Sequence, residues 1–258
     1  MTQGAEPRSP SARAPAIESI GLTKVFHNPR TGDVTAASGI TFECYPGEIF
    51  GLLGPNGAGK STTLRMLSTI LKPTAGTGRV AGFDVVEDPL GVRRSIGYLS
   101  ASTGLYGRLT PRETLEYFGG LHGLDKMRLK DRIGELLRLF GIEEFAGIRC
   151  EKLSTGMKQK VSIARAIVHD PPILILDEPT LGLDVLVSSV MIRFVAECRE
   201  RGKCIIFSTH ILSEVEKLCD RVAVIHRGTL RACGTLPELR ERTGKQFMDD
   251  VFMSLVES

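Results

Sequence analysis

The 258-residue chain has no apolar run long enough to cross a bilayer, and its N-terminus lacks the apolar core of a signal peptide. These absences predict a protein that is cytosolic, or that meets a membrane only through another subunit. Its six cysteines form no C-x-x-C pair, which argues against a zinc site, and most stand in apolar runs, as buried reduced thiols do. The net charge of +3 is too small to indicate nucleic acid or an anionic membrane as a partner.

What the chain does have is the ordinary composition of a globular protein, with 42% hydrophobic and 24% charged residues. Its length is enough for one large α/β domain with a substantial core. Residues 1–16 are rich in Pro, Ala and Ser, and we expect them to form a disordered leader. Beyond them, alternating polar and apolar residues predict two antiparallel strands, over 16–26 and 34–44.

The rest of the chain predicts strands alternating with helices, the pattern of a parallel sheet covered by helices on both faces. The strands are expected at 48–53, 96–99, 173–176, 204–208 and 222–225, and the helices at 61–71, 111–140, 157–168, 185–198 and 212–219.

Glycine is the residue type in excess, with 28 residues, and one cluster fits the pattern G-x-x-x-x-G-K-[ST]. The motif is Gly54-Pro55-Asn56-Gly57-Ala58-Gly59-Lys60-Ser61. It follows a strand and opens a helix, so its backbone N–H groups are placed to cradle phosphate oxygens. Lys60 would then reach the β- and γ-phosphates, and the Ser61 hydroxyl would bind Mg²⁺. The alternative is a glycine-rich turn without a ligand.

The apolar strand at 173–176 ends in two adjacent carboxylates, Asp177 and Glu178. Together with a P-loop, this pattern predicts that Asp177 holds Mg²⁺, through water or Ser61, and that Glu178 polarises the attacking water. The alternative is a solvated strand end with a turn at Pro179.

A third segment, at 153–160, reads Leu-Ser-Thr-Gly-Met-Lys-Gln-Lys and opens a helix. Ser154 is a natural N-cap, so composition alone favours a simple helix start. The functional alternative is that Ser154, the Gly156 backbone and the helix dipole together form an anion site.

With these motifs the chain resembles the ATP-binding cassette (ABC) ATPases over residues 17–233. Five motifs follow the family's order and spacing, namely the P-loop at 54–61, LSTGM at 153–157, ILILDEP at 173–179, Leu183-Asp184 and Ser208-Thr209-His210. The resemblance implies an α/β fold with a P-loop NTPase (RecA-like) core and an N-terminal antiparallel β subdomain. It also implies a helical insert at about 100–165 that carries the signature, and a C-terminal helical tail at 234–258.

The resemblance further implies that ATP binds with Mg²⁺, that Glu178, His210 and Lys60 are catalytic, and that Ser61 and Asp177 hold the metal. His210 would contact the γ-phosphate. Two cassettes would pair head to tail, with the signature of one closing on the P-loop of the other and Asp184 crossing the interface. The implied ATP-binding residues are Phe26, Gly54, Pro55, Asn56, Gly57, Ala58, Gly59, Lys60, Ser61, Thr62, Ser154 and Gly156. Phe26 would stack on adenine; the alternative for Phe26 is a strand core residue.

The chain departs from the family pattern in the signature and after the strand at 96–99. Thr155 and Met157 replace the first Gly and the Gln of LSGGQ, and Ala101 stands where a glutamine normally senses Mg²⁺ and the attacking water. We expect Ser100 or Ser102, or a water held by one of them, to contact the metal instead. The alternative is a connecting loop with solvated serines.

These departures, and the tail sequence at 249–252, resemble exporter ATPases of the bacterial sodium-extrusion type. The resemblance thus implies the ATP-hydrolysing subunit of an exporter of the sodium-extrusion or drug-export type, peripheral to the cytoplasmic side of the membrane through a separate permease. No nucleic acid is expected as a partner. The alternatives are a soluble ABC ATPase outside transport and a regulatory nucleotide-binding module that does not hydrolyse ATP.

A docking surface for the permease is expected at the helical insert, here roughly residues 100–150, which begins with two glycines, Gly104 and Gly107, and contains an aromatic group of Tyr106, Tyr117 and Phe118. A groove beside this segment would receive a short helix of the permease. The alternative is that Tyr117 and Phe118 pack internally.

Overall fold

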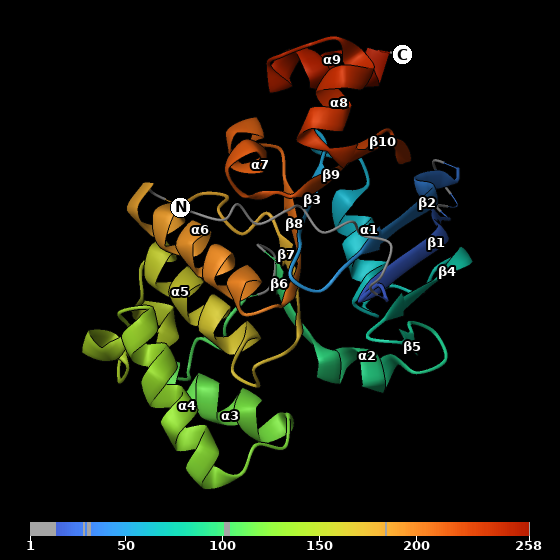
Figure 1. The fold of residues 1–258 in the computed structure, drawn as a ribbon. Helices are drawn as coiled ribbons and strands as arrows, with labels where there is room; N and C mark the ends of the chain where they lie inside the picture. Colours follow the sequence, from blue (N-terminus) through green and yellow to red (C-terminus); the bar gives the residue numbers. More distant parts are fainter. Residues whose placement is uncertain (1–13, 28, 30–31, 101–103, 184, 258) are drawn as a thin grey trace.

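The computed structural model describes residues 14–257 except 28, 30–31, 101–103 and 184. Its centre is a six-stranded sheet (Figure 1). In spatial order the strands are β10 (Thr229–Thr235), β9 (Arg221–His226), β3 (Ile49–Leu53), β8 (Cys204–Thr209), β7 (Ile173–Asp177) and β6 (Ile96–Ser100). The five strands from β9 to β6 are parallel, and β10 pairs antiparallel to β9. Every residue of β3, β7 and β8 is buried, which explains their continuous apolar sequence.

A second, four-stranded antiparallel sheet lies beside the first (Figure 1). Its order is β2 (Val34–Cys44), β1 (Ile17–Phe26), β4 (Ala75–Val80) and β5 (Phe83–Asp84). The pairing of β1 with β2 confirms the expected antiparallel strands. The expected leader falls on residues 1–13, outside the described residues, and on 14–16, where Ala16 N–H donates to the Cys44 carbonyl at 2.8 Å.

Helix α1 follows the P-loop and contacts strands of both sheets, so it joins the two layers (Figure 1). The helices are α1 (Lys60–Leu67), α2 (Pro89–Ser95), α3 (Pro111–Leu121), α4 (Lys126–Leu139), α5 (Thr155–Ala166), α6 (Val185–Glu200), α7 (Leu212–Leu218), α8 (Leu236–Thr243) and α9 (Met248–Glu257). Two short 3-10 turns, Glu143–Phe145 and Cys150–Lys152, lead into α5. In the described part of the chain, no helix is both long and apolar enough to cross a membrane.

The expected helix over 111–140 is wrong at its middle, where the chain forms two helices. Gly123 adopts a φ of +77°, which ends the helical path, and Asp125 caps α4 by accepting from the N–H groups of Met127 and Arg128. The predicted apolar face of α4 is confirmed, because Ile133, Leu136 and Leu137 are buried.

Several elements lie where the sequence analysis expected none, namely β4, β5, α2 and β10. Helix α1 also ends at Leu67, earlier than the expected 71. Helices α8 and α9 fall within residues 236–257, and β10 extends to Thr235, into the range expected for the tail. All six cysteines are free and five are buried, as expected for reduced thiols.

Candidate functional site

The P-loop follows β3 at the carboxyl end of the parallel sheet, the edge at which open α/β sheets bind ligands. Its glycines are required by close backbone contacts. A Cβ on Gly54 would lie 2.2 Å from the Ile225 carbonyl oxygen, and a Cβ on Gly59 would lie 2.4 Å from that of Ala36. Gly59 also has a φ of +106°, so no other residue fits this turn without strain.

The loop encloses a pocket of about 260 Å³ that is lined by residues 55–62, Ala36 and Glu178. Of the P-loop segment expected to bind ATP, residues 55–62 therefore form one concave surface with the expected catalytic carboxylate, and Gly54 lies outside that lining. Gly59 precedes α1 without a side-chain cap, so the first N–H groups of the helix are not taken by a capping side chain.

Lys60 is almost fully buried, with 4% of its side chain exposed. Its Nζ donates to the carbonyl oxygens of Gly54 at 2.6 Å and Pro55 at 3.2 Å, and lies 3.1 Å from Glu178 Oε1. The P-loop lysine and the carboxylate that follows β7 thus form a buried ion pair.

Asp177 is the last residue of β7 and faces α1 across the sheet edge. Its Oδ1 accepts from Ser61 Oγ at 3.0 Å and from Ser208 Oγ at 2.8 Å. The two residues expected to hold Mg²⁺ are therefore in contact, although 116 positions separate them in the chain. A carboxylate beside a hydroxyl is the hard oxygen donor set that Mg²⁺ accepts.

Glu178 has a φ of +48°, a left-handed conformation that is uncommon for a residue other than glycine. Its N–H donates to Ser208 Oγ at 3.0 Å, and its Oε2 lies 3.3 Å from Nδ1 of His210. Both carboxylate oxygens are therefore held, one by Lys60 and one by His210. Strained backbones of this kind cluster at functional sites.

Ser208 belongs to the site, and the sequence analysis gave it no role. Its hydroxyl donates to Asp177 and accepts from Glu178 N–H, so it fixes both carboxylate residues. The available signal was its place in Ser208-Thr209-His210, at the end of a strand next to the 173–177 strand. Thr209 extends the network, because it donates to Glu214 at 2.6 Å and accepts from Ile211 N–H at 3.0 Å.

The loop expected to replace the missing glutamine lies partly outside the described residues, which exclude Ala101 and Ser102. Ser100 is described: it is buried at the end of β6 and pairs in register with Asp177. Asp184, expected to cross a dimer interface, also lies outside the described residues.

The signature segment begins α5, with Ser154 as N-cap accepting from Met157 N–H at 3.3 Å. The predicted helix start is thus present. Ser154 and Thr155 are exposed, and within the described residues the lining of the P-loop pocket includes neither Ser154 nor Gly156. Gln159 of the same helix donates to the Pro179 carbonyl at 2.9 Å, which ties α5 to the segment after Glu178.

Phe26 lies at the end of β1 with 41% of its surface exposed. The Lys24 Nζ lies 5.4 Å from its ring centroid, and the ring is not part of the buried core. This exposure argues against the strand-core alternative, and adenine stacking stays a prediction.

The aromatic group of the helical insert is exposed in part. The rings of Tyr106 and Tyr117 are 6.2 Å apart and both residues are at least half exposed, whereas Phe118 is packed against the core. Tyr106 and Phe118 line a groove of about 380 Å³ together with Tyr98 and two arginines, Arg93 and Arg165.

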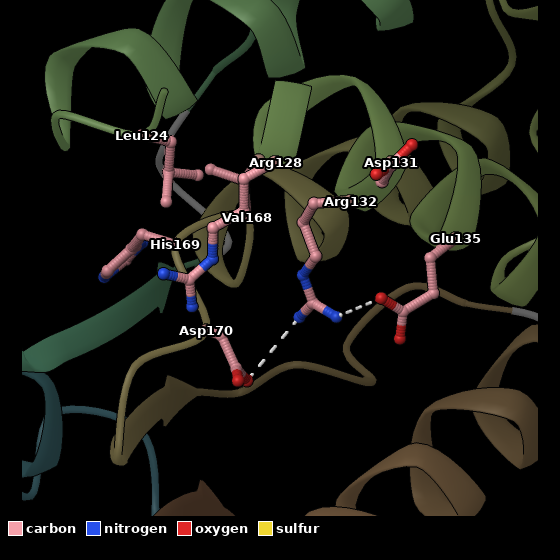
Figure 2. Close-up of a pocket in the computed structure, with 8 residues that line it drawn as sticks. All are labelled: Leu124, Arg128, Asp131, Arg132, Glu135, Val168, His169 and Asp170. Atoms are coloured by element: carbon pink, nitrogen blue, oxygen red, sulfur yellow. Dashed lines mark hydrogen bonds and ion pairs between the residues drawn. The ribbon is translucent and has the colours of Figure 1, made fainter. Parts of the chain in front are cut away.

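Another pocket, of about 270 Å³, lies between α4 and the segment 168–170 and contains no P-loop residue (Figure 2). Figure 2 shows Arg132 between two carboxylates, Glu135 at 2.7 Å and Asp170 at 3.6 Å. At its edge the rings of His169 and His122 stack with centroids 3.5 Å apart. Because Arg132 is paired with both Glu135 and Asp170, we interpret this pocket as part of the structural framework and not as a ligand site.

The chain is similar to known proteins in both sequence and fold. A family model described as ABC transporter matches residues 37–181. The ABC transporter ATP-binding protein NatA of Bacillus subtilis is 43% identical over 222 residues, which cover 86% of this chain and 90% of NatA. A solved structure described as an ATP-binding subunit of an ABC transporter has a TM-score of 0.84 and 32% identity, covering 93% of this chain and 99% of that chain. A dimeric ATP-binding cassette in a post-hydrolysis state, bound to ADP and Pi, has a TM-score of 0.78 and 25% identity, covering 85% and 98%.

Proposed function

The chain belongs to the family of ABC transporter ATP-binding proteins, and we propose that it drives export of the sodium-extrusion or drug-export type through a separate membrane permease. It is an ATPase with a P-loop NTPase fold. The observation that carries the proposed mechanism is the contact between the P-loop and the two carboxylates after β7, made by Lys60 with Glu178 and by Ser61 with Asp177.

ATP binding begins at the P-loop, whose N–H groups and α1 terminus face a concave surface suited to phosphate oxygens. Lys60 supplies the buried positive charge. To reach the phosphates, its Nζ must leave the carbonyls of Gly54 and Pro55 and the carboxylate of Glu178. ATP binding therefore frees Glu178 Oε1 for another partner. Phe26, exposed at the end of β1, is proposed to stack on adenine.

Glu178 is proposed to act as the general base, accepting a proton from the water that attacks the γ-phosphate. His210 holds the other carboxylate oxygen at 3.3 Å and so orients the base, and it is proposed to contact the γ-phosphate itself. The hydrogen bond from Glu178 N–H to Ser208 fixes the backbone from which the base projects.

Mg²⁺ is proposed to bind at Ser61 and Asp177, where it would neutralise charge on the phosphates. Among the described residues, no three His, Cys, Asp or Glu side chains form a metal cluster. Phosphate and water oxygens would therefore complete the coordination, as is usual for Mg²⁺ in nucleotide sites. The buried Ser100 beside Asp177, or a water that it holds, is proposed as a further oxygen donor.

A second copy of the chain is proposed to complete the site by head-to-tail pairing. Ser154 and Thr155 are exposed at the start of α5, and the P-loop pocket of their own chain is lined by other residues. The solved cassette of 25% identity is dimeric, which supports this pairing. Ser154 and the Gly156 backbone of one copy would then meet the γ-phosphate held by the other.

The permease is proposed to dock at the groove lined by Tyr106, Phe118, Arg93 and Arg165. Arg165 stacks over the Phe118 ring at 5.3 Å and donates to the Gly104 carbonyl at 3.0 Å, so the groove has a fixed wall. Tyr106 is 58% exposed and is available for contact. Docking here would hold the protein at the cytoplasmic side of the membrane through its partner.

The proposed mechanism is tested by Glu178→Gln, which keeps the shape of the base and removes its charge. Loss of a group that acts in the transition state should lower kcat by about 10²-fold or more without weakening ATP binding. The variant should therefore accumulate as an ATP-bound dimer, seen by light scattering. Glu216→Gln, which breaks an exposed ion pair with Arg240, is the control and should keep the wild-type rate. Wild-type turnover in Glu178→Gln would remove Glu178 from the role of base.

A further inference from the structure

A cavity of about 270 Å³ adjoins the P-loop, and Pro55 and Asn56 line both this cavity and the phosphate pocket. Its lining is mostly apolar and comes from three separate parts of the chain. The first is the P-loop entrance at 53–56, the second is the start of α7 with His210 and Leu212, and the third is Phe252 of the last helix.

The last helix is firmly attached to the domain. Helix α9 buries Met248, Val251 and Leu255 in the same core that contains β3 and β7 residues, and it contacts α7, α8, β9 and β10. Figure 1 shows α8 and α9 together at the end of the molecule nearest α7 and β10. Because three neighbouring side chains fix the helix, the half-buried Phe252 ring is held at the cavity rather than in solvent.

The cavity wall is shared with the groups that carry the chemistry. Gly54 and Pro55 line it, and their carbonyl oxygens accept from Lys60 Nζ. His210 also lines it, and its ring reaches Glu178 Oε2. Phe252 therefore lines the same cavity as residues at both ends of the Lys60–Glu178–His210 chain of contacts.

The P-loop and His210, at the two ends of this chain of contacts, are held in place by different parts of the protein. The P-loop backbone packs closely against Ile225 at Gly54 and against Ala36 at Gly59, where a Cβ would lie 2.2 Å and 2.4 Å from their carbonyl oxygens, and the Ala58 carbonyl accepts from Gly228 N–H at 2.8 Å. The backbone beside His210 is held by Thr209, which bridges Glu214 and Ile211 N–H. The His210 ring itself is 35% exposed and borders the cavity, so its orientation depends on what fills that space.

We propose that Phe252 is a positioning residue for His210: its ring limits the space behind the imidazole and so keeps the imidazole directed at Glu178. This goes beyond the proposed function by giving the C-terminal helix a part in turnover, and it rests on the role proposed above for His210. Phe252 touches neither reacting atoms nor nucleotide in this scheme, and acts through the histidine alone.

Phe252→Ala should enlarge the cavity and allow the imidazole to turn away from Glu178. The kcat for ATP should fall about tenfold. The KM should change less than about twofold, because contacts other than those of Phe252 hold the P-loop backbone. Phe252→Leu, which refills much of the space, should restore kcat to within about twofold of wild type. Met253→Ala is the matched control, since Met253 is the next residue of α9 and is 49% exposed. It should behave as wild type.

Two measurements separate positioning from general damage. In a His210→Ala background, Phe252→Ala should lower the remaining rate no further, because the two residues act as one unit. Independently of activity, the His210 ring resonance, assigned among the five histidines by its loss in His210→Ala, should shift in Phe252→Ala and return in Phe252→Leu.

An equal tenfold loss in the His210→Ala background, or an unmoved His210 resonance in Phe252→Ala, would overturn the proposal. Failure of the proposed function looks different, because it would show as full activity in Glu178→Gln, whatever happens at Phe252.

Discussion

The ion pair between Lys60 and Glu178 makes a quantitative prediction about how ATP binding and stability are linked. The two side chains are 4% and 14% exposed, and their charged atoms are 3.1 Å apart. With an effective dielectric constant of about 20, the attraction is about 5 kcal/mol, an upper bound because both groups lose hydration. Replacing Glu178 by Gln leaves Lys60 buried without its partner charge. We expect this to lower the free energy of unfolding by about 2–3 kcal/mol.

For a chain of this size, that loss lowers Tm by about 5–10 °C in the absence of nucleotide. The opposite effect is expected for nucleotide affinity. Wild-type Lys60 must leave Glu178 to meet the phosphates, whereas in Glu178→Gln it has no such competitor. The Kd for a non-hydrolysable ATP analogue should therefore fall about tenfold, equivalent to about 1.4 kcal/mol.

Differential scanning fluorimetry and isothermal titration calorimetry measure the two effects on the same protein. The control is Glu216→Gln, whose ion pair with Arg240 has a similar distance of 2.8 Å but is about 40% exposed on both sides. An exposed pair should contribute less than about 1 kcal/mol. If Glu178→Gln has the same Tm as this control and binds the analogue with wild-type affinity, the ion pair between Lys60 and Glu178 does not oppose ATP binding.

Three further predictions concern the surfaces and the acid stability of the protein. Mg²⁺ and ATP should dimerise the chain, and Ser154→Arg should block that dimer in light scattering, because a bulky side chain would fill the γ-phosphate contact of the partner copy. Tyr106→Ala should keep basal ATPase activity and lose its stimulation by the permease in reconstituted vesicles; equal loss of both would indicate folding damage. Burial, together with the stacked His122 ring, lowers the pKa of His169 to about 4. The unfolded chain therefore binds more protons than the folded chain between pH 6.5 and 4. The free energy of unfolding should fall by up to about 3 kcal/mol as the pH drops through that range, and in His169→Gln, measured by denaturant unfolding at each pH, it should depend less on pH.

The parts of the site that are contiguous in the chain could be predicted from the sequence. The P-loop at 54–61 specifies its own conformation, because Gly54 and Gly59 are the residues that permit the close approaches to β9 and β2. The continuous apolar runs of β3, β7 and β8 likewise predicted buried parallel strands. From these, the meeting of Ser61 with Asp177 follows, since parallel strands bring their carboxyl ends to one edge.

What could not be predicted depends on pairing between distant segments or on backbone geometry. Strand β4, with the sequence Ala-Gly-Thr-Gly-Arg-Val, has two glycines and little alternation, and it is a strand because β1 offers it hydrogen bonds. Ser208 looked like any strand-end serine until the register placed it opposite Asp177. The left-handed φ of Glu178 and the cavity at Phe252 could not be predicted from any pattern in the sequence.

The proposed mechanism predicts that an isolated chain turns over ATP slowly. The proposed base has one oxygen held by Lys60 and the other by His210, so neither is available to water while both contacts persist. ATP can remove the first contact, because its phosphates compete for Lys60. The further donors proposed for the γ-phosphate, Ser154 and the Gly156 backbone, lie at the start of a helix whose N-terminus is exposed and does not line the P-loop pocket of the described chain. In the proposed mechanism, hydrolysis therefore needs nucleotide to release one oxygen of Glu178 from Lys60, and a second copy to complete the contacts to the γ-phosphate, while His210 keeps the carboxylate oriented.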